Sequence, residues 1–174
     1  ISRIIFIFLL GFSYYVSNKK FIKFLDKILL LIFLSLIMNI VTYIFFPQNY
    51  VRFGILHFLT TSLILLSLMS NIHKFLPIIS GIIMFIVYIF VISKKTTSNI
   101  LLNSIGFQPD YSTMDYFPIF KWFWLVGLGY ISSKYIKIDN KPINNVILKG
   151  ISNIGKNSLL IYVIHFPIIF CIHK

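Results

Sequence analysis

A histidine lies inside an apolar stretch of the chain, five residues after an arginine. His57 follows Arg52 in the sequence VRFGILHFL, and the apolar run continues to Met69. In a helix, five residues correspond to ~7–8 Å, so the imidazole would lie deeper in the run than the guanidinium. An ionisable side chain inside a membrane span is costly and usually functional. The next question is therefore which other residues share the depth of His57.

The composition indicates an integral membrane protein. Of the 174 residues, 58% are hydrophobic and 11% are charged, whereas about 25% are charged in a soluble domain. The net charge of +12 does not indicate nucleic acid, because the lysines lie in short segments between apolar runs, where they orient membrane spans. Lipid is therefore the expected partner, and no nucleic-acid partner is expected. The single cysteine, Cys171, excludes a disulfide framework or a cysteine-based metal site within the chain, and no metal is expected.

Long, continuous apolar runs predict an all-α fold, a polytopic bundle of transmembrane helices. The runs lack the alternation that is typical of barrel strands. We expect one membrane-embedded domain over residues 1–174. Its spans are connected by a basic turn at 19–27, a short turn at 47–50, a tight polar link at 71–74, a polar loop at 93–113 and a basic loop at 134–157. The expected spans are residues 1–17, 28–46, 53–69, 76–92, 116–133 and 158–172.

The distribution of lysine and arginine predicts the orientation of these spans. Lysines at positions 19–27, 74 and 134–156 outnumber the cations at the opposite ends, so their side is predicted to be cytoplasmic. Residue 1 then lies on the outer side, within an apolar run. We therefore expect the sequence to be truncated at its N-terminus, with an odd number of spans preceding it.

Five polar side chains share the outer third of the membrane in this topology: Arg3, Arg52, His57, Asp115 and Lys121. Such side chains should face the bundle interior or a wet cavity. His57 with Asp115 would form a general base and its orienting carboxylate. Arg3 and Arg52 are suited to holding an anionic group.

Each of these residues also has a structural interpretation. His57 could be a packed or interfacial histidine, while Arg3, Arg52 and Lys121 could extend to lipid headgroups. Asp115 could be the N-cap of the fifth helix, because a proline follows three positions later. The sequence alone leaves these alternatives open.

His165 lies within the last apolar run, two residues before Pro167. Proline lacks a backbone N–H, which frees the carbonyl of Val163. His165 therefore either accompanies a kink or lines a substrate path, and both interpretations stay open.

The motifs of soluble enzymes do not occur in the sequence. There is no glycine-rich phosphate loop, no HExxH, no GxSxG and no pair of carboxylates within one predicted helix. Gly127 and Gly129, with Gly11 and Gly54, predict close helix packing rather than nucleotide binding.

Three stretches, taken in order, resemble one family. They are RFGILHF from Arg52, DYFPIFKW from Asp115 followed by LVGLG, and IGKNSLLIYVIHFP from Ile154. Together they resemble the bacterial branch of the heparan-alpha-glucosaminide N-acetyltransferase catalytic domain family, which belongs to the multi-span membrane acyltransferases. Arg3 and the run that ends in Gly-x-Ser resemble the second helix of that family, so the resemblance covers essentially the whole chain.

The resemblance implies a multi-pass enzyme of the bacterial cytoplasmic (inner) membrane. It would move an acetyl or other acyl group from cytosolic acetyl-CoA or another acyl-CoA to a sugar or glycolipid acceptor, at an amine or hydroxyl on the far side. By motif position, the resemblance implies that Arg52, His57, Asp115 and His165 are pocket residues. A histidine that is important in eukaryotic relatives precedes the helix beginning here at Arg3 and has no counterpart in this sequence.

Two functions follow from these observations. In an acyltransferase, His57, oriented by Asp115, would take the proton of the acceptor, and the basic loops would suit the anionic end of CoA. In a non-enzymatic transporter or lipid-binding protein, the same polar groups would line a permeation or lipid path. A homodimer is left open. The expected substrate-binding residues are Arg3, Arg52, His165 and Lys121, the last of which stands where relatives usually have proline.

Overall fold

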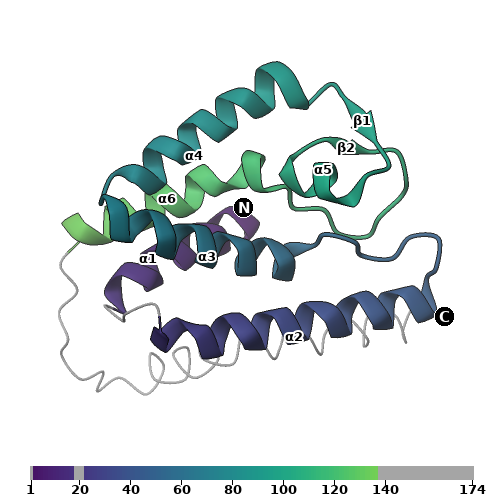
Figure 1. Cartoon of the computed structure of the whole chain (residues 1–174), viewed down its shortest axis with the longest axis horizontal. Coiled ribbons are helices and arrows are strands. Elements are labelled where there is room, and N and C mark those ends of the chain that lie inside the picture. The colour runs from purple at the N-terminus through teal and green to yellow at the C-terminus, as the bar shows by residue number, and fades with distance from the viewer. Residues whose placement is uncertain (1, 18–21, 137–174) are drawn as a thin grey trace. The chain divides into compact units, whose positions relative to one another are not determined.

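Helices make up most of the protein in the computed structural model, which describes residues 2–17 and 22–136 (Figure 1). The described residues belong to one unit, residues 1–137, and the all-α prediction is confirmed for this part apart from a minimal pair of strands. The elements are α1 (Ser2–Val16), α2 (Ile22–Phe45), α3 (Ile55–Ile72), α4 (Leu76–Val87), the π-helix η1 (Tyr88–Ile92), β1 (Thr96–Thr97), α5 (Ile100–Ile105), β2 (Gln108–Pro109) and α6 (Ile119–Tyr135).

Two of these helices are long and apolar enough to cross a membrane, namely α2 over Leu25–Phe45 and α3 over Ile55–Ile72. The segments Arg3–Val16 and Leu76–Ile92 are shorter apolar helices. Helices therefore occupy the first five predicted spans, but length and hydropathy support crossing at two of them. The sixth predicted span, which carries His165, lies outside the described residues, so a bundle of six spans stays a prediction.

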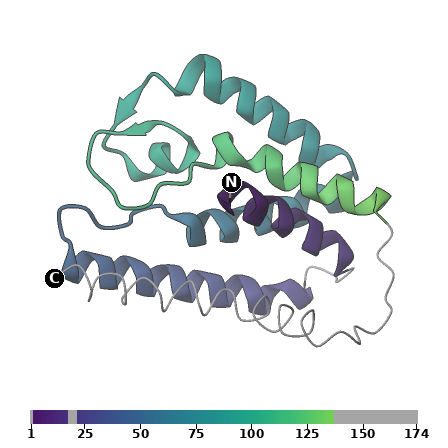
Figure 2. The ribbon, with the colours of Figure 1, turned by 180° about the vertical axis from the view of Figure 1, so that it is seen from behind.

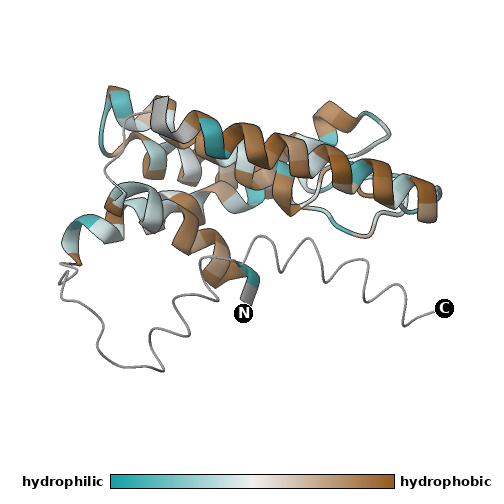
Figure 3. Cartoon of the chain, turned by 90° about the horizontal axis from the view of Figure 1, so that it is seen from below, coloured by the Kyte–Doolittle hydropathy of each residue, from teal (hydrophilic) through white to brown (hydrophobic). Residues whose placement is uncertain are grey.

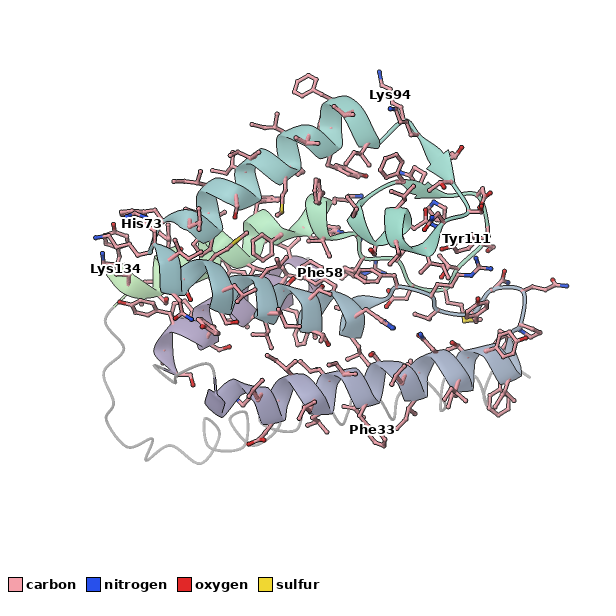
Figure 4. All side chains as sticks on the ribbon, in the orientation of Figure 1. Phe33, Phe58, His73, Lys94, Tyr111 and Lys134 are labelled. Atoms are coloured by element: carbon pink, nitrogen blue, oxygen red, sulfur yellow. The ribbon has the colours of Figure 1, made fainter. Side chains whose placement is uncertain are left out.

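The outer face of α2 has the composition of a surface that contacts lipid. Leu29, Phe33 and Ile44 are 61%, 60% and 67% exposed, and Phe33 points away from α3 in Figure 4. Hydrophobic residues cover most of the helical surface in Figure 3, whereas hydrophilic residues gather in the turns and loops. Exposed apolar area of this extent is unusual in a soluble monomer, and it is expected of lipid-facing helices.

Glycines allow α6 to pack closely against both α1 and α4. A Cβ atom on Gly11 of α1 would lie 1.9 Å from the Val126 carbonyl oxygen, and one on Gly129 would lie 2.0 Å from the Phe8 carbonyl oxygen. On its other side, Gly127 of α6 meets the first turn of α4. Figure 2 shows α1 lying along α6 when the protein is seen from behind. The prediction that glycines serve helix packing is confirmed for Gly11, Gly127 and Gly129, whereas Gly54 lies against the Asp115 carboxylate and Val51 instead of another helix.

The predicted polar loop at 93–113 contains secondary structure that the sequence analysis did not expect. Strand β1 pairs in parallel with β2, and α5 lies between them. Asn99 caps α5 because its side-chain oxygen accepts a hydrogen bond from the Leu101 amide at 2.9 Å. Gly106, with φ of +157°, ends the helix. A helix of six residues is too short to show an apolar periodicity in the sequence.

The interpretation of Asp115 as the N-cap of the fifth helix is wrong. Helix α6 begins at Ile119, and its N-cap is Pro118 in an extended conformation. The residues directly before Pro118 are not helical, and one of them, Tyr116, forms an isolated parallel bridge with Phe53.

Candidate functional site

Two segments lie side by side next to the N-terminal end of α3. We call them the seam, which consists of residues 49–55 and 113–117. The backbone hydrogen bonds that join them run from Met114 N to Asn49 O at 3.1 Å and from Phe117 N to Phe53 O at 3.3 Å. The seam places residues that are about 60 positions apart in the sequence beside the first turn of α3.

Asp115 lies in the seam and holds the start of α3. Its Oδ2 accepts a hydrogen bond from the Ile55 amide at 2.8 Å. Gly54 permits this approach, because a Cβ atom there would lie 2.6 Å from Asp115 Oδ2. A carboxylate at this position satisfies an amide that has no partner within the helix and favours the positive end of the helix dipole. Asp115 therefore fixes α3 two residues before His57.

Asn39 of α2 orients His57. In the amide orientation that satisfies its neighbours, the Asn39 side-chain oxygen accepts from His57 Nε2 at 3.2 Å, and its NH₂ donates to the Val51 carbonyl at 2.8 Å and the Ser35 carbonyl at 3.3 Å. Thr42 Oγ1 accepts from the Val51 amide at 3.1 Å. Asn39 and Thr42 thus link one face of α2 to the seam and to α3.

The second ring nitrogen of His57 remains available for chemistry. Because Nε2 donates to Asn39, the neutral imidazole carries its proton there and a lone pair on Nδ1. His57 Nδ1 is buried and finds no hydrogen-bond partner among the described residues. The Phe53 ring lies beside the imidazole, with ring centroids 5.5 Å apart. A buried, oriented nitrogen lone pair is suited to accepting a proton from a bound substrate.

These contacts differ from the pairing of His57 with Asp115 that the sequence analysis expected. In the described hydrogen bonds, the Asn39 side-chain oxygen accepts from the imidazole, and the Asp115 carboxylate accepts from the Ile55 amide. Catalytic roles for His57 and Asp115 stay predictions. Sequence reasoning missed Asn39 and Thr42, although polar side chains on one face of an apolar helix are a signal for interhelical hydrogen bonding.

The guanidinium of Arg52 lies against two tyrosine rings. Its Cζ atom is 3.6 Å from the ring centroid of Tyr111 and 4.8 Å from that of Tyr50. We call Tyr50, Arg52 and Tyr111 the tyrosine clamp. Such stacking is favourable for a guanidinium, because its planar charge faces the electron-rich surface of each ring.

The other two predicted cations also contact aromatic rings. Arg3 is exposed and lies 5.6 Å over the ring of Phe117, which belongs to the seam. Lys121 Nζ lies 5.4 Å from the Trp122 ring and 5.8 Å from the ring of Tyr88 in η1. Arg3 therefore reaches the seam, while Lys121 lies toward η1.

Tyr116 ties the segment 93–113 to the seam. Its hydroxyl donates to the Phe107 carbonyl at 2.6 Å and to the Asn103 carbonyl at 2.9 Å. Burial raises the pKa of Tyr116, and the neighbouring phenols of Tyr88 and Tyr111 raise it further. The Tyr116 hydroxyl therefore stays protonated and serves as a hydrogen-bond donor.

The expected role of His165 and the expectation of no metal concern residues that lie partly or wholly outside the described part of the chain. His165 falls beyond residue 136, and its substrate-binding role stays a prediction. Within residues 2–17 and 22–136, no group of three or more histidine, cysteine, aspartate or glutamate side chains could hold a metal ion.

An apolar helical fold with two helices of membrane-spanning length, one of which carries an oriented histidine, is compatible with a membrane-embedded transferase. The family model for heparan-alpha-glucosaminide N-acetyltransferase, catalytic, matches residues 1–167. The chain therefore belongs to this family, as its motifs predicted, and the family indicates membrane acetyltransferase activity in general. Neither the search of curated proteins nor the search of solved structures gave a match.

Proposed function

We propose that the protein transfers an acetyl or other acyl group from acyl-CoA on the cytoplasmic side to a sugar amine or hydroxyl on the outer side of the membrane. Membership of the acetyltransferase family supports the reaction class. The observation that carries the assignment of a site is His57, whose Nε2 is bound to Asn39 while its buried Nδ1 has no hydrogen-bond partner among the described residues.

In the proposed reaction, the acceptor gives its proton to His57 Nδ1 as its oxygen or nitrogen bonds to the thioester carbonyl carbon. The carbon–sulfur bond then breaks, and CoA leaves as a thiol after taking up the proton. Asn39 supports this step, because its carbonyl oxygen keeps accepting from Nε2–H as positive charge develops on the imidazole. The products are an acylated acceptor and free CoA.

Asp115 would act on this reaction by fixing the first turn of α3, which carries His57. Arg52 would hold the acceptor, and Arg3, Lys121 and His165 would contribute to the substrate path. A bacterial inner membrane, lipid contacts along the apolar helices and a possible homodimer belong to the same proposal.

The structure separates residues that the sequence analysis assigns to opposite sides of the membrane. Lys134 lies at the end of the helices opposite Tyr111 and Lys94 (Figure 4). Lys134 belongs to the lysine-rich side that the sequence analysis predicts to be cytoplasmic. The tyrosine clamp and the start of α3 would then face the acceptor on the outer side.

The test uses the full-length gene product in membrane vesicles with radiolabelled acetyl-CoA, followed by extraction of glycans and lipids. We expect His57→Gln to lower the rate of transfer by about 10²–10⁴-fold, the contribution of a positioned general base. His73→Gln is the matched control, because His73 is exposed at the other end of α3 and bonds only locally, to the Phe75 amide. It should leave the rate unchanged.

Two results would count against the proposal. Equal transfer by His57→Gln and the wild type would remove His57 from the mechanism. No transfer by correctly inserted wild-type protein from any acyl-CoA would favour the alternative function, transport or lipid binding without catalysis.

A further inference from the structure

The guanidinium of Arg52 lies against two aromatic rings and has a donor without a hydrogen-bond partner among the described residues. The rings of Tyr111 and Tyr50 lie over the group, at 3.6 and 4.8 Å from Cζ. The Nε atom of Arg52 is buried and has no hydrogen-bond partner among the described residues. A buried guanidinium donor of this kind favours an anionic acceptor from outside the described residues.

The tyrosine clamp is held in place by contacts on both sides. The phenol of Tyr111 accepts a hydrogen bond from Asn103 Nδ2 at 2.8 Å, and Asn103 is 1% exposed. On the other side, the Tyr50 ring packs edge-on against Tyr43 of α2, with centroids 5.2 Å apart. A cation whose neighbours are fixed in advance loses less entropy when it binds a ligand.

The backbone also fixes the two halves of the clamp relative to each other. Thr113 Oγ1 donates to the Tyr50 carbonyl at 3.2 Å, and Met114 N donates to Asn49 O at 3.1 Å. These bonds join the segment that carries Tyr111 to the segment that carries Tyr50 and Arg52. These hydrogen bonds therefore fix the backbone that carries Tyr50 and Arg52 relative to the backbone that carries Tyr111.

We infer that the tyrosine clamp binds a phosphate ester through the edge of the Arg52 guanidinium. A guanidinium edge matches two oxygens of one phosphate group. Lys94 and Lys95 lie in the adjoining segment, where the Lys95 carbonyl accepts a hydrogen bond from Gln108 N at 2.9 Å. These two lysines add positive charge to that of the clamp, and Asp110 offsets one of the charges. The position at an end of the apolar helices is where phosphate groups of lipids lie.

The clamp is linked to His57 through one residue. Phe53 follows Arg52 directly, and its ring packs against the His57 imidazole. A phosphate ester on Arg52 would hold the rest of the same molecule next to His57 Nδ1. The assignment of this ester to the acceptor, as in a lipid-linked sugar, rests on the proposed transferase function; the binding itself does not.

The test measures binding by the full-length protein purified into nanodiscs of defined composition. In one arm, labelled phosphatidic acid is compared with diacylglycerol, which has the same chains without phosphate. In the second arm, glucosamine 1-phosphate is compared with glucosamine. We expect at least one phosphate-bearing probe to bind tenfold or more tightly than the matching probe without phosphate. The arm that shows this preference identifies the ligand as a lipid headgroup or a soluble phosphate ester.

Substitutions then assign the binding to the clamp. Arg52→Gln should abolish the preference for phosphate, and Arg52→Lys should lose most of it because a lysine presents no planar edge. Tyr111→Leu should weaken it by removing the ring that lies closest to the guanidinium. Lys74→Gln removes an exposed charge just beyond the opposite end of α3 and should retain it. Thermal unfolding of each variant shows whether the fold is intact.

A phosphate preference that survives in folded Arg52→Gln protein would overturn the inference, as would the absence of any preference in the wild type. Failure of the transferase proposal alone gives a different result. The phosphate preference would still depend on Arg52, but the wild type would transfer no acyl group. If both proposals hold, Arg52→Gln should raise KM for a phosphate-bearing acceptor at least tenfold with little change in kcat.

Discussion

Helices α1, α4 and α6 pack through glycines, whereas the start of α3 is held by polar side chains of the seam and α2. In the first region, backbones touch so closely that a single added carbon atom has no space. In the second, Asn39, Thr42 and Asp115 connect segments through hydrogen bonds at 2.8–3.2 Å. The first region is suited to stability, and the second to setting the orientation of individual groups such as His57.

The largest effect is expected where glycine contacts backbone. Gly129→Leu should prevent α1 from reaching α6, because even its Cβ atom would lie 2.0 Å from Phe8 O. The loss in unfolding free energy should exceed the ~1–3 kcal/mol of ordinary overpacking. Tyr135→Leu, at the exposed end of the same helix, should change it by less than ~0.5 kcal/mol. Denaturant unfolding in detergent micelles measures both, and a Gly129→Leu protein as stable as the wild type would contradict the packing.

The second prediction separates orientation of His57 from stability of the seam. Asn39→Leu removes the acceptor of His57 Nε2 and a donor to Val51 O. Thr42→Val disturbs the same Val51 backbone without touching His57. We expect kcat of acyl transfer to fall about 10–100-fold in Asn39→Leu, roughly 1.4–2.7 kcal/mol, and much less in Thr42→Val. Equal kcat values in the two variants would mean that Asn39 serves the fold alone.

Tyr116→Phe should weaken the attachment of the 93–113 segment. The variant loses the donor to two backbone carbonyls, at a cost of about 1–2 kcal/mol. The pKa of Tyr116 is raised in the folded state, so its stabilising contribution is present below about pH 10, the usual pKa of a phenol, and declines above it. Unfolding measured at about pH 8 and pH 10.5 should show a smaller alkaline loss in Tyr116→Phe than in Tyr135→Phe; equal losses would argue against this role.

The smallest effect is expected for Asp115→Asn. The amide oxygen of asparagine can still accept from the Ile55 amide, while the negative charge at the helix N-terminus is lost. That charge contributes ~0.3–1 kcal/mol, so transfer activity should fall by a few-fold at most. A loss as large as that of His57→Gln would instead make Asp115 a catalytic partner of the histidine, as the sequence analysis expected.

Much of the helical framework could be predicted from the sequence. Apolar runs identified α2 and α3, and the glycines of α6 predicted its close packing. These features are local, since each depends on a few neighbouring residues and on hydropathy. Segment 93–113 was predicted less well, because α5 and the β1–β2 pair are too short to produce a periodic pattern.

The candidate site could be predicted only in part, because its hydrogen bonds join distant parts of the chain. Asp115 lies three residues before Pro118, and local spacing therefore assigned it to α6, but its carboxylate accepts from the amide of Ile55, 60 residues away. Asn39 sits in an apolar run with no motif around it, and only its spacing from other polar residues of α2 distinguishes it. His57 could be singled out because an ionisable residue in an apolar run is unusual.

The central claim is that Asn39 holds His57 with its proton on Nε2 and leaves Nδ1 to accept a proton. Solid-state NMR of full-length protein in lipid bilayers, with ¹⁵N-labelled histidine, reports which ring nitrogen carries the proton, and His57→Gln identifies the signal. The structure predicts that His57 is protonated at Nε2, with an unprotonated Nδ1, and that Asn39→Leu disturbs this state. A neutral His57 whose proton lies on Nδ1 would contradict the account.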